Sequence, residues 1–378
     1  MKLNKMFVGV VISIWCVMVL LNFFLPKVEF SDSENRFLTR LPSFSTDSLV
    51  KGTYMQKVDD YINDHFIGRD TWIAMKSQME YILGKRENNG VFIGENRLIE
   101  DLPPPDAEMV SKNIDGLKRF AEIFRKPAYL LIAPSAESVQ SDKLPRFAHS
   151  WDQKSFIADV NTQLEGLIKP INIYDTLYLH KDEYIYYKTD HHWTTDGAFL
   201  AYQETAAAMG LNLKTFSDFV VNDVSTDFYG TLYSKSGYKN VTADTIRSYE
   251  IGKALKMTVL NGSESVDYDT VYFPDFLKVR DKYAYFLNGN QALLTIRTES
   301  KSGKKLLVFK DSYAHSMIPM LFDDYSEITV VDLRFLNVNI NEMIDINKFD
   351  ESLFIFSIDM FSHQLNTGKL SWMEVGGG

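Results

Sequence analysis

Two segments of the sequence carry side chains that could perform covalent chemistry. Residues 187–197 read Tyr-Lys-Thr-Asp-His-His-Trp-Thr-Thr-Asp-Gly, and residues 310–316 read Lys-Asp-Ser-Tyr-Ala-His-Ser. A serine, a histidine and a carboxylate can together supply a nucleophile, its base and the group that orients the base. These two segments therefore predict acyl-transfer chemistry at a serine.

The Asp-x-His spacing distinguishes between two adjacent histidines. If residues 190–192 are extended, the side chains of Asp190 and His192 lie on one side of the chain and His191 points to the other. Asp190 would then hold one ring nitrogen of His192, while the other nitrogen faces a nucleophile. We therefore expect His192 to be the base and Asp190 the group that orients it.

The nucleophile is expected where a predicted central strand ends. Ser312 follows the apolar run 306–309 and precedes a predicted helix. Ligands of open α/β sheets bind at this edge, and N–H groups at the start of a helix can stabilise an oxyanion. Ser312 is therefore the preferred nucleophile, with Ser135, Ser234 and Ser316 as alternatives.

A metal site is the alternative interpretation of the first segment. Its ligands would be Asp190, His191, His192 and Asp196, but adjacent histidines on an extended segment diverge, and the ligand spacing of zinc enzymes is missing. We expect no metal and no other cofactor, because serine chemistry needs none.

Two further residues near these segments have a structural and a functional interpretation. Trp193 is predicted to be a core anchor rather than a platform for a sugar ring. Arg334, which follows a predicted strand ending at Asp332, suits an ion pair as well as a substrate clamp.

The elements that must position these residues alternate between strand and helix. This alternation predicts an α/β domain with a largely parallel sheet. Short Val-, Tyr-, Phe- and Thr-rich runs replace the helical period between residues 211 and 300, which predicts a β-rich insertion over the main sheet. The expected elements of the α/β part are helices over 106–126, 151–168 and 195–209, a helix from about Tyr313, a helix near 341–346, and strands at 129–133, 171–174, 305–309, 328–332 and 353–358.

The N-terminal segment is predicted to anchor the chain in a membrane. An apolar run from Met6 to Leu25 ends at Pro26, and about twenty helical residues cover a hydrocarbon core of roughly 30 Å. No small-residue cleavage site follows it, so we expect an uncleaved anchor over residues 1–26. Because Lys2 and Lys5 precede the run, the rest of the chain is expected to be extracytoplasmic.

The remainder of the chain is expected to be a helical membrane-proximal segment (27–95) and a catalytic domain (96–375). Three glycines at 376–378 look like an appended linker. The sole cysteine, Cys16, lies in the anchor, so the outer part carries no disulfide. A net charge of −10 argues against nucleic acid as a partner.

Several motifs together resemble the bacterial DHHW family, which is similar to the SGNH-like O-acetyltransferases of the alginate acetylation machinery. The resemblance covers nearly the whole chain past the anchor. The matching segments are Ser33–Arg36, Asp64–Arg69, Tyr187–Ala198, Gly230–Ser236, Lys310–Ala314 and Asp332–Arg334.

The resemblance implies a circularly permuted SGNH-hydrolase-like domain with Asp190, His192 and Ser312 as its triad. It implies that an acetyl group passes through an acyl-serine to a hydroxyl of an exopolysaccharide or cell-wall polysaccharide. A multi-spanning membrane-bound O-acyltransferase would be the partner that delivers the acetyl group. A polysaccharide acetyl esterase and a non-catalytic polysaccharide-binding assembly component are the alternatives.

The oxyanion hole is the part of the site that the resemblance does not supply. The Gly-Asp-Ser-Leu block of SGNH hydrolases and its separate Gly and Asn oxyanion pair are absent from this sequence. We expect the Ser312 backbone N–H to take this role, helped by Arg334 or Tyr313.

Overall fold

The computed structural model describes residues 2–24, 27–31, 36–252, 255–262, 264–336 and 339–373. Pro26, most of the Ser33–Arg36 motif, the end of the predicted catalytic domain and the 376–378 glycines lie outside the described residues.

An eight-stranded mixed sheet forms the centre of the domain, in the order β10-β9-β11-β13-β12-β14-β5-β6. Neighbouring strands from β13 to β6 are parallel, and β11, β9 and β10 continue the sheet in antiparallel pairs. The fold is therefore mixed α/β, with its parallel part at the position of the predicted buried strands. The bounds are β5 Ala128–Ala133, β6 Lys169–Pro170, β9 Leu255–Asn261, β10 Glu264–Tyr268, β11 Leu293–Thr298, β12 Lys305–Lys310, β13 Glu327–Val331 and β14 Glu351–Ser357.

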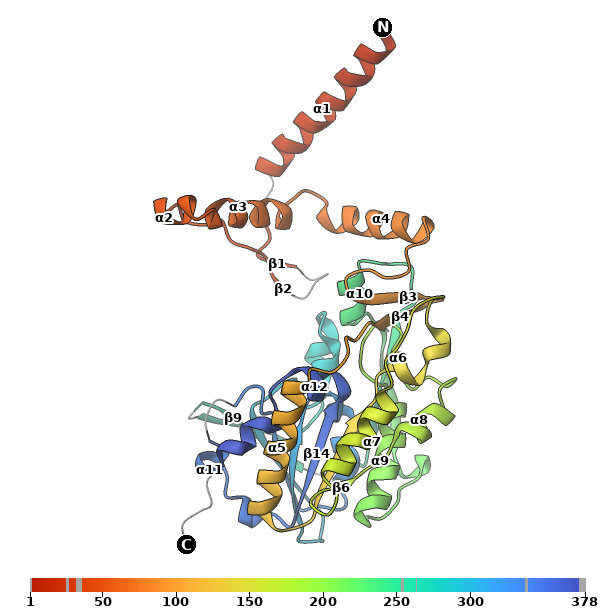
Figure 1. Ribbon diagram of the computed structural model, residues 1–378, viewed down its shortest axis with the longest axis vertical. Coiled ribbons are helices and arrows are strands. Elements are labelled where there is room, and N and C mark those ends of the chain that lie inside the picture. The colour runs from red at the N-terminus through yellow and green to blue at the C-terminus, as the bar shows by residue number, and fades with distance from the viewer. Residues whose placement is uncertain are drawn as a thin grey trace.

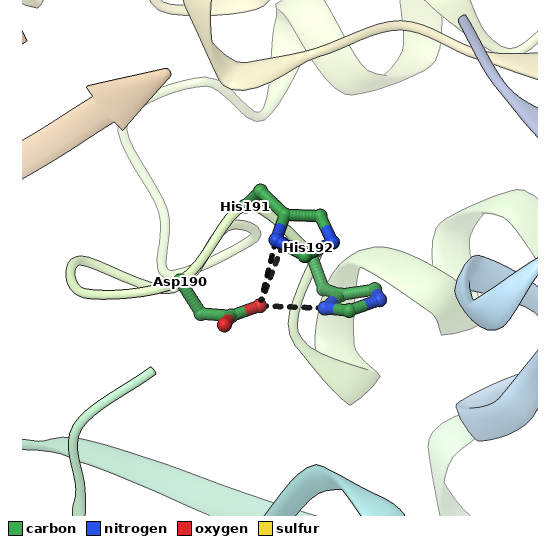
Figure 2. A group of neighbouring side chains, drawn as sticks. All are labelled: Asp190, His191 and His192. Carbon is green, nitrogen blue, oxygen red and sulfur yellow. Dashed lines mark hydrogen bonds and ion pairs between the residues drawn. The ribbon is translucent and has the colours of Figure 1, made fainter. Parts of the chain in front are cut away.

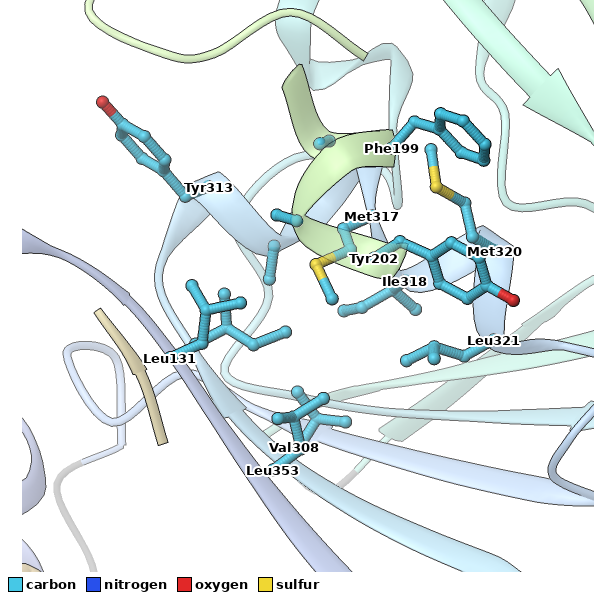
Figure 3. Packing of buried hydrophobic residues seen from close by; sticks show 14 of the residues in the cluster. Leu131, Phe199, Tyr202, Val308, Tyr313, Met317, Ile318, Met320, Leu321 and Leu353 are labelled. Atoms are coloured by element: carbon cyan, nitrogen blue, oxygen red, sulfur yellow. The ribbon is translucent and has the colours of Figure 1, made fainter. Parts of the chain in front are cut away.

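One face of the sheet is covered by α9 (Thr195–Met209) and the segment that follows β12. Leu131, Val308 and Leu353 project from three neighbouring parallel strands into this layer, where Phe199 and Tyr202 of α9 meet them (Figure 3). The Thr194 side chain caps the start of α9 by accepting from the Gly197 N–H, as its position predicts.

The other face is covered by α5 (Ala107–Phe124), together with α7 (Gln153–Gln163). Because successive residues of a strand point to opposite faces, Phe309 and Phe354 lie on this side. Phe120 of α5 meets both rings edge-on, at centroid distances of 5.3 and 5.2 Å. Burial on both faces explains the continuous apolar runs of these strands.

Residues 211–300 are rich in strands but differ from the predicted insertion over the sheet. Their strands β9, β10 and β11 extend the edge of the main sheet, and β7 (Val220–Phe228) pairs with β8 (Asp244–Glu250) in a separate hairpin. The third small pair joins β3 (Val91–Gly94) and β4 (Arg97–Glu100).

Several predicted elements are shorter than expected, among them the helices predicted over 151–168 and near 341–346, where α7 and α11 (Ile340–Met343) cover only part of the range. No strand forms over 171–174: β6 lies just before this range, only the bond from the Ile171 N–H to the Leu130 carbonyl continues its pairing, and α8 (Tyr174–Leu179) begins at Tyr174. The helix from Tyr313 is a single 3₁₀ turn, η5 (Ser312–Ser316). The remaining elements are α6 Ala136–Val139, α10 Thr231–Ser236, α12 Ile358–His363, η1 Ser141–Lys143, η2 Phe216–Asp218, η3 Pro274–Lys278, η4 Lys282–Tyr285, η6 Ile318–Leu321, η7 Ile346–Lys348 and η8 Thr367–Trp372.

The N-terminal part projects from the domain (Figure 1). Helix α1 (Lys2–Phe24) is long and apolar enough over Lys5–Asn22 to cross a membrane. Helices α2 (Thr46–Val50), α3 (Thr53–Asp64) and α4 (Arg69–Ile82) form a layer that runs crosswise to α1, between α1 and the domain, and β1 (Phe30–Ser31) pairs with β2 (Arg36–Phe37) beneath them (Figure 1).

Candidate active site

The Asp-His-His segment is a hairpin loop, not the extended segment that the sequence predicted. Tyr186 and Trp193 pair as an antiparallel bridge, and the Tyr187 N–H donates to the His192 carbonyl. Between them the chain turns, because Asp190 Oδ1 accepts a hydrogen bond from the His192 backbone N–H at 3.0 Å. An aspartate that binds the backbone two residues on is typical of such a turn.

Asp190, His192 and Ser312 nevertheless form one hydrogen-bonded chain. His192 Nδ1 lies 2.5 Å from Asp190 Oδ1, and its Nε2 lies 2.8 Å from Ser312 Oγ. The second carboxylate oxygen of Asp190 accepts from the backbone N–H and the hydroxyl of Thr231, at the start of α10. The structure thus joins the three residues singled out in the sequence, and their catalytic roles remain a prediction.

The burial of Asp190 and His192, and the charges around them, favour a neutral histidine beside an ionised aspartate. Burial alone would raise the pKa of Asp190, but His191, His192 and the Thr231 N–H hold it below its usual range. Burial and the neighbouring His191 lower the pKa of His192, and Asp190 only partly opposes them. His192 therefore donates through Nδ1 and can accept a proton at Nε2.

His191 lies beside His192 rather than on the opposite side of the chain, which corrects the prediction from an extended segment. The two ring centroids are 4.0 Å apart, and Asp190 faces both rings (Figure 2). His191 Nδ1 lies 2.8 Å from Thr231 Oγ1 and 3.7 Å from Asp190 Oδ1. Sequence spacing could not reveal this arrangement, because it depends on the turn.

The compact Asp190-His191-His192 cluster has ligand atoms within 4.8 Å of one another, as a metal site requires. The fourth residue of the metal interpretation is not part of it. Asp196 accepts instead from Arg247 NH1 at 2.8 Å and from the Tyr249 hydroxyl at 2.6 Å.

Ser312 directly follows β12, at the carboxyl edge of the parallel strands. The Asp311 carboxylate holds the backbone around Ser312 in place. One of its oxygens accepts from the Tyr313 N–H, and the other accepts from the Ser357 N–H at the end of β14. The Ser312 N–H opens the 3₁₀ turn, and no acceptor in the described part of the chain binds it.

The three alternative nucleophiles are engaged elsewhere. Ser135 Oγ bonds the Gln153 amide, Ser234 Oγ accepts from Arg280, and Ser316 Oγ lies 3.4 Å from the Tyr283 hydroxyl. Within the described ranges, no histidine nitrogen bonds any of these serines.

Tyr283, which sequence reasoning passed over as part of a strand, stacks on the candidate base. It belongs to η4, and its ring lies nearly parallel to that of His192 at a centroid distance of 4.1 Å. Its hydroxyl lies 3.3 Å from the Ser312 carbonyl oxygen. The 211–300 region therefore supplies one wall of the site.

Trp193 lies in the interior, whereas Tyr313 also lines the candidate cavity beside Ser312. Trp193 is fully buried, and its indole N–H donates to the Tyr313 carbonyl. The Tyr313 hydroxyl donates to the His191 carbonyl, and its backbone N–H is bound by Asp311. Because these N–H and O–H donors are already bonded, neither residue offers a free donor to an oxyanion.

A buried charged network lies behind Ser312. Arg334 forms an ion pair with Asp332 at 2.7 Å, and Asp332 also binds Lys310 at 3.0 Å. Lys310 in turn lies 2.7 Å from His315 Nε2. Arg334 lines the candidate cavity and is held by the carboxylate two residues before it, which is one of the two roles considered for it.

His315 is the second residue that sequence reasoning did not single out. Its ring is buried, and among the described residues no partner binds its Nδ1. Because the Lys310 side chain, paired with Asp332, donates to Nε2, the ring proton belongs on Nδ1. Burial and the charge of Lys310 hold the pKa of His315 well below its usual range, so the ring stays neutral.

The candidate site lies in a cavity of about 740 Å³. This volume is within the range of small-molecule sites. Ser312, His192, His315 and Arg334 line one part of it. Acidic groups line another part, where burial, and next the charge of Asp101, raise the pKa of Glu137 to about 8. The cavity can therefore hold a polar ligand against the candidate nucleophile.

The fold and the site define an α/β protein with a candidate Ser-His-Asp site at the carboxyl edge of its sheet. The sequence model of the DHHW protein family matches residues 34–123 and 117–331, which make up most of the chain. The chain belongs to the DHHW family.

Several solved structures are similar to this chain. A DHHW family protein from Eubacterium siraeum is 22% identical with a TM-score of 0.64, covering 75% of this chain and 95% of its own. PatB1 of Bacillus cereus, solved with a sulfonyl adduct, is 17% identical with a TM-score of 0.63, covering 73% and 97%. The O-acetyltransferase domain of Pseudomonas putida AlgJ is 13% identical with a TM-score of 0.47, covering 75% and 98%. No curated protein sequence matches the chain.

Proposed function

We propose that this chain is an extracytoplasmic O-acetyltransferase, which moves an acetyl group through acyl-Ser312 onto a hydroxyl of an exopolysaccharide or cell-wall polysaccharide. The observation that carries this proposal is the 2.8 Å contact between Ser312 Oγ and His192 Nε2, with Asp190 on the other ring nitrogen. The chain's membership of the DHHW family, which resembles the SGNH-like O-acetyltransferases, supports the choice of reaction. We include a circularly permuted SGNH-hydrolase-like fold in the proposal.

The proposed reaction has two symmetrical halves. Ser312 Oγ attacks the acetyl carbonyl carbon while its proton passes to His192 Nε2, and the same proton then leaves with the donor's departing group. In the second half an acceptor hydroxyl gives its proton to His192 and attacks the acyl-serine. The new ester forms, Ser312 recovers its proton, and no cofactor is consumed.

The oxyanion formed in both halves needs donors, and we assign His315 Nδ1–H to this role beside the Ser312 N–H. His315 Nδ1 is a buried donor without a partner in the described residues, and its ring lines the cavity that holds Ser312. A neutral N–H fixed by Lys310 can face developing charge without reorganising. We prefer His315 to Tyr313, whose N–H and O–H are both bonded, and to Arg334, which is held in an ion pair with Asp332.

Two substitutions separate the catalytic from the structural role of His315. The amide of His315→Gln falls near the Nε2 position and keeps an acceptor for Lys310, but it loses the Nδ1 donor. The amide of His315→Asn falls near Nδ1 and loses the contact with Lys310 instead. We expect His315→Gln to lower kcat by about 10²–10³-fold with little change in Tm. His315→Asn should keep more activity and have the lower Tm. If kcat follows Tm in both variants, His315 is only structural.

The two adjacent histidines are expected to differ in importance. His192→Gln should lower kcat/KM by at least about 10³-fold, because the base is lost. His191→Gln should retain most of the activity, since His191 bonds Thr231 and not Ser312. Because His191 lowers the pKa of His192, its removal should shift the acid limb of the kcat/KM profile to higher pH. Equal losses in both variants would contradict this assignment.

The proposed location follows from α1. An apolar helix at the N-terminus is consistent with a single-pass anchor that keeps the domain outside the cytoplasm and beside the membrane. The proposed source of acetyl groups is a multi-spanning membrane-bound O-acyltransferase, which would present them at the outer face. The acceptor is a polysaccharide and not a nucleic acid, in keeping with the negative net charge.

Transfer and hydrolysis are distinguished by the fate of the acetyl group. Purified full-length protein in detergent is given an activated acetyl ester with and without oligosaccharides, and the products are analysed by mass spectrometry. A transferase diverts acetyl from water to sugar, and Ser312→Ala stops both reactions. If no oligosaccharide gains an acetyl group and acetylated polymer instead loses its esters, the chain is an esterase. If neither reaction occurs, the proposed function is wrong.

A further inference from the structure

Helix α4 has two apolar faces, and only one of them packs on the catalytic domain. Ile73, Ser77 and Tyr81 recur every four residues on the domain side. Ser77 bonds the Ser236 carbonyl at 3.2 Å, the ring of Tyr81 meets that of Tyr238 at 4.9 Å, and Ile73 lies against Gly237.

The opposite face of α4 carries an exposed apolar stripe, formed by Trp72, Met75, Met79 and Ile82, with Leu83 just beyond the helix end. These side chains are 50–80% exposed and recur at three- and four-residue spacing. At 100° per residue, the stripe lies on the side of the helix away from Ser77. The helix already packs on the domain through its other face. An exposed apolar stripe of this size therefore indicates a second binding partner.

The position of α4 indicates what that partner is. Lys27 Nζ bonds the Asn22 carbonyl near the end of α1 and also lies 3.3 Å from the carbonyl of His65, which ends α3. Helix α4 begins four residues after His65. It runs crosswise to α1, with the domain on one side and the direction of α1 on the other (Figure 1). The stripe therefore faces the side on which the proposed membrane span extends.

We infer that α4 lies in the membrane–water interface, with its stripe inserted among the lipid headgroups and its other face carrying the catalytic domain. Tryptophan and methionine on one side of a helix that lies in the plane of the bilayer are suited to this depth, and Lys76 at the edge of the stripe can meet anionic headgroups. The inference rests on the proposed anchoring by α1. It makes α4 a second membrane contact that sets the orientation of the domain.

The test measures the contact of single side chains with lipid in the full chain. Cys16, the native cysteine of α1, is labelled with an environment-sensitive fluorophore in the wild-type protein. In a Cys16→Ala background the same label is placed on Met75→Cys and Met79→Cys, and on Leu179→Cys as a control. Leu179 is an apolar residue that is even more exposed than Met75 and Met79, at the end of α8 on the domain. The proteins are reconstituted into phosphatidylcholine–phosphatidylglycerol vesicles with lipid that carries a spin-label quencher near the head of its acyl chain.

We expect the labels at 75 and 79 to lose most of their fluorescence to the quencher and the label at 179 to lose none. Unchanged Tm values would show that the exposed substitutions leave the fold intact. Quenching at 16 without quenching at 75 and 79 would overturn the inference while leaving the anchor in place. An effect at 75 and 79 that appears only in native membranes and not in vesicles would also overturn it, and would assign the stripe to a protein partner. Absence of quenching at 16 would instead refute the anchor.

Discussion

Replacement of Ser312 by alanine should lower the rate of acetyl transfer and of acetyl-ester cleavage by at least about 10³-fold, because the attacking atom is lost. The hydroxyl contributes one hydrogen bond, to His192, and little packing. The Tm should therefore change little. The measurement is steady-state cleavage of a chromogenic acetyl ester, followed by mass spectrometry of the intact protein for an acetyl adduct, which the wild type should form and the variant should not.

Ser234→Ala and Ser316→Ala are the matched controls for this prediction. Each removes one hydroxyl near the same cavity, and neither hydroxyl bonds a histidine in the structure. Both variants should keep most of the activity. Activity that survives in Ser312→Ala but is lost in one of the controls would move the nucleophile to that serine.

A methyl group at Gly230 should be nearly as damaging as removal of the orienting carboxylate. A Cβ at this position would lie 2.3 Å from both Cβ and Oδ2 of Asp190, which is too close for any rotamer to relieve. The backbone here is extended, with φ −83°, so the effect comes from this contact and not from backbone strain. We expect Gly230→Ala to push Asp190 away from His192 and to lower kcat on the order of 10³–10⁴-fold.

Thr231→Ser is the control for the Gly230 prediction, since it keeps both hydrogen bonds to Asp190 without adding an atom. It should stay close to wild type. The displaced carboxylate can be observed directly, because the His192 Nδ1 proton should lose its low-field NMR signal in Gly230→Ala. Wild-type activity in Gly230→Ala would show that α10 moves instead and that the position of Asp190 is not set by this contact.

The sequence predicted the central part of the fold and the members of the candidate triad, for reasons that are local. Continuous apolar runs such as 129–133 and 306–309 identify strands buried on both faces, and Ser312 follows the second of them after two residues. Asp190 bonds His192 as expected, although the segment between them is a turn and not extended. These inferences need only the neighbours of a residue in the chain.

Features that depend on distant residues could not be predicted in this way. The turn that brings His191 against His192 forms because Asp190 binds backbone, which an Asp-x-His pattern does not distinguish from a strand. The tautomer of His315 depends on Lys310, whose charge depends on Asp332. Strands β9, β10 and β11 join the main sheet because β11 pairs with β13, and a pattern within residues 211–300 does not contain this pairing.

Helix α10 limits how the chain can vary in length. Its first residues, Gly230 and Thr231, hold Asp190, and Ser236 at its other end accepts from Ser77 of α4. One inserted residue would turn one end relative to the other by about 100° and break one of these two connections. Natural relatives should therefore differ in length at exposed turns such as residues 299–304 but keep a constant number of residues between Gly230 and Gly237.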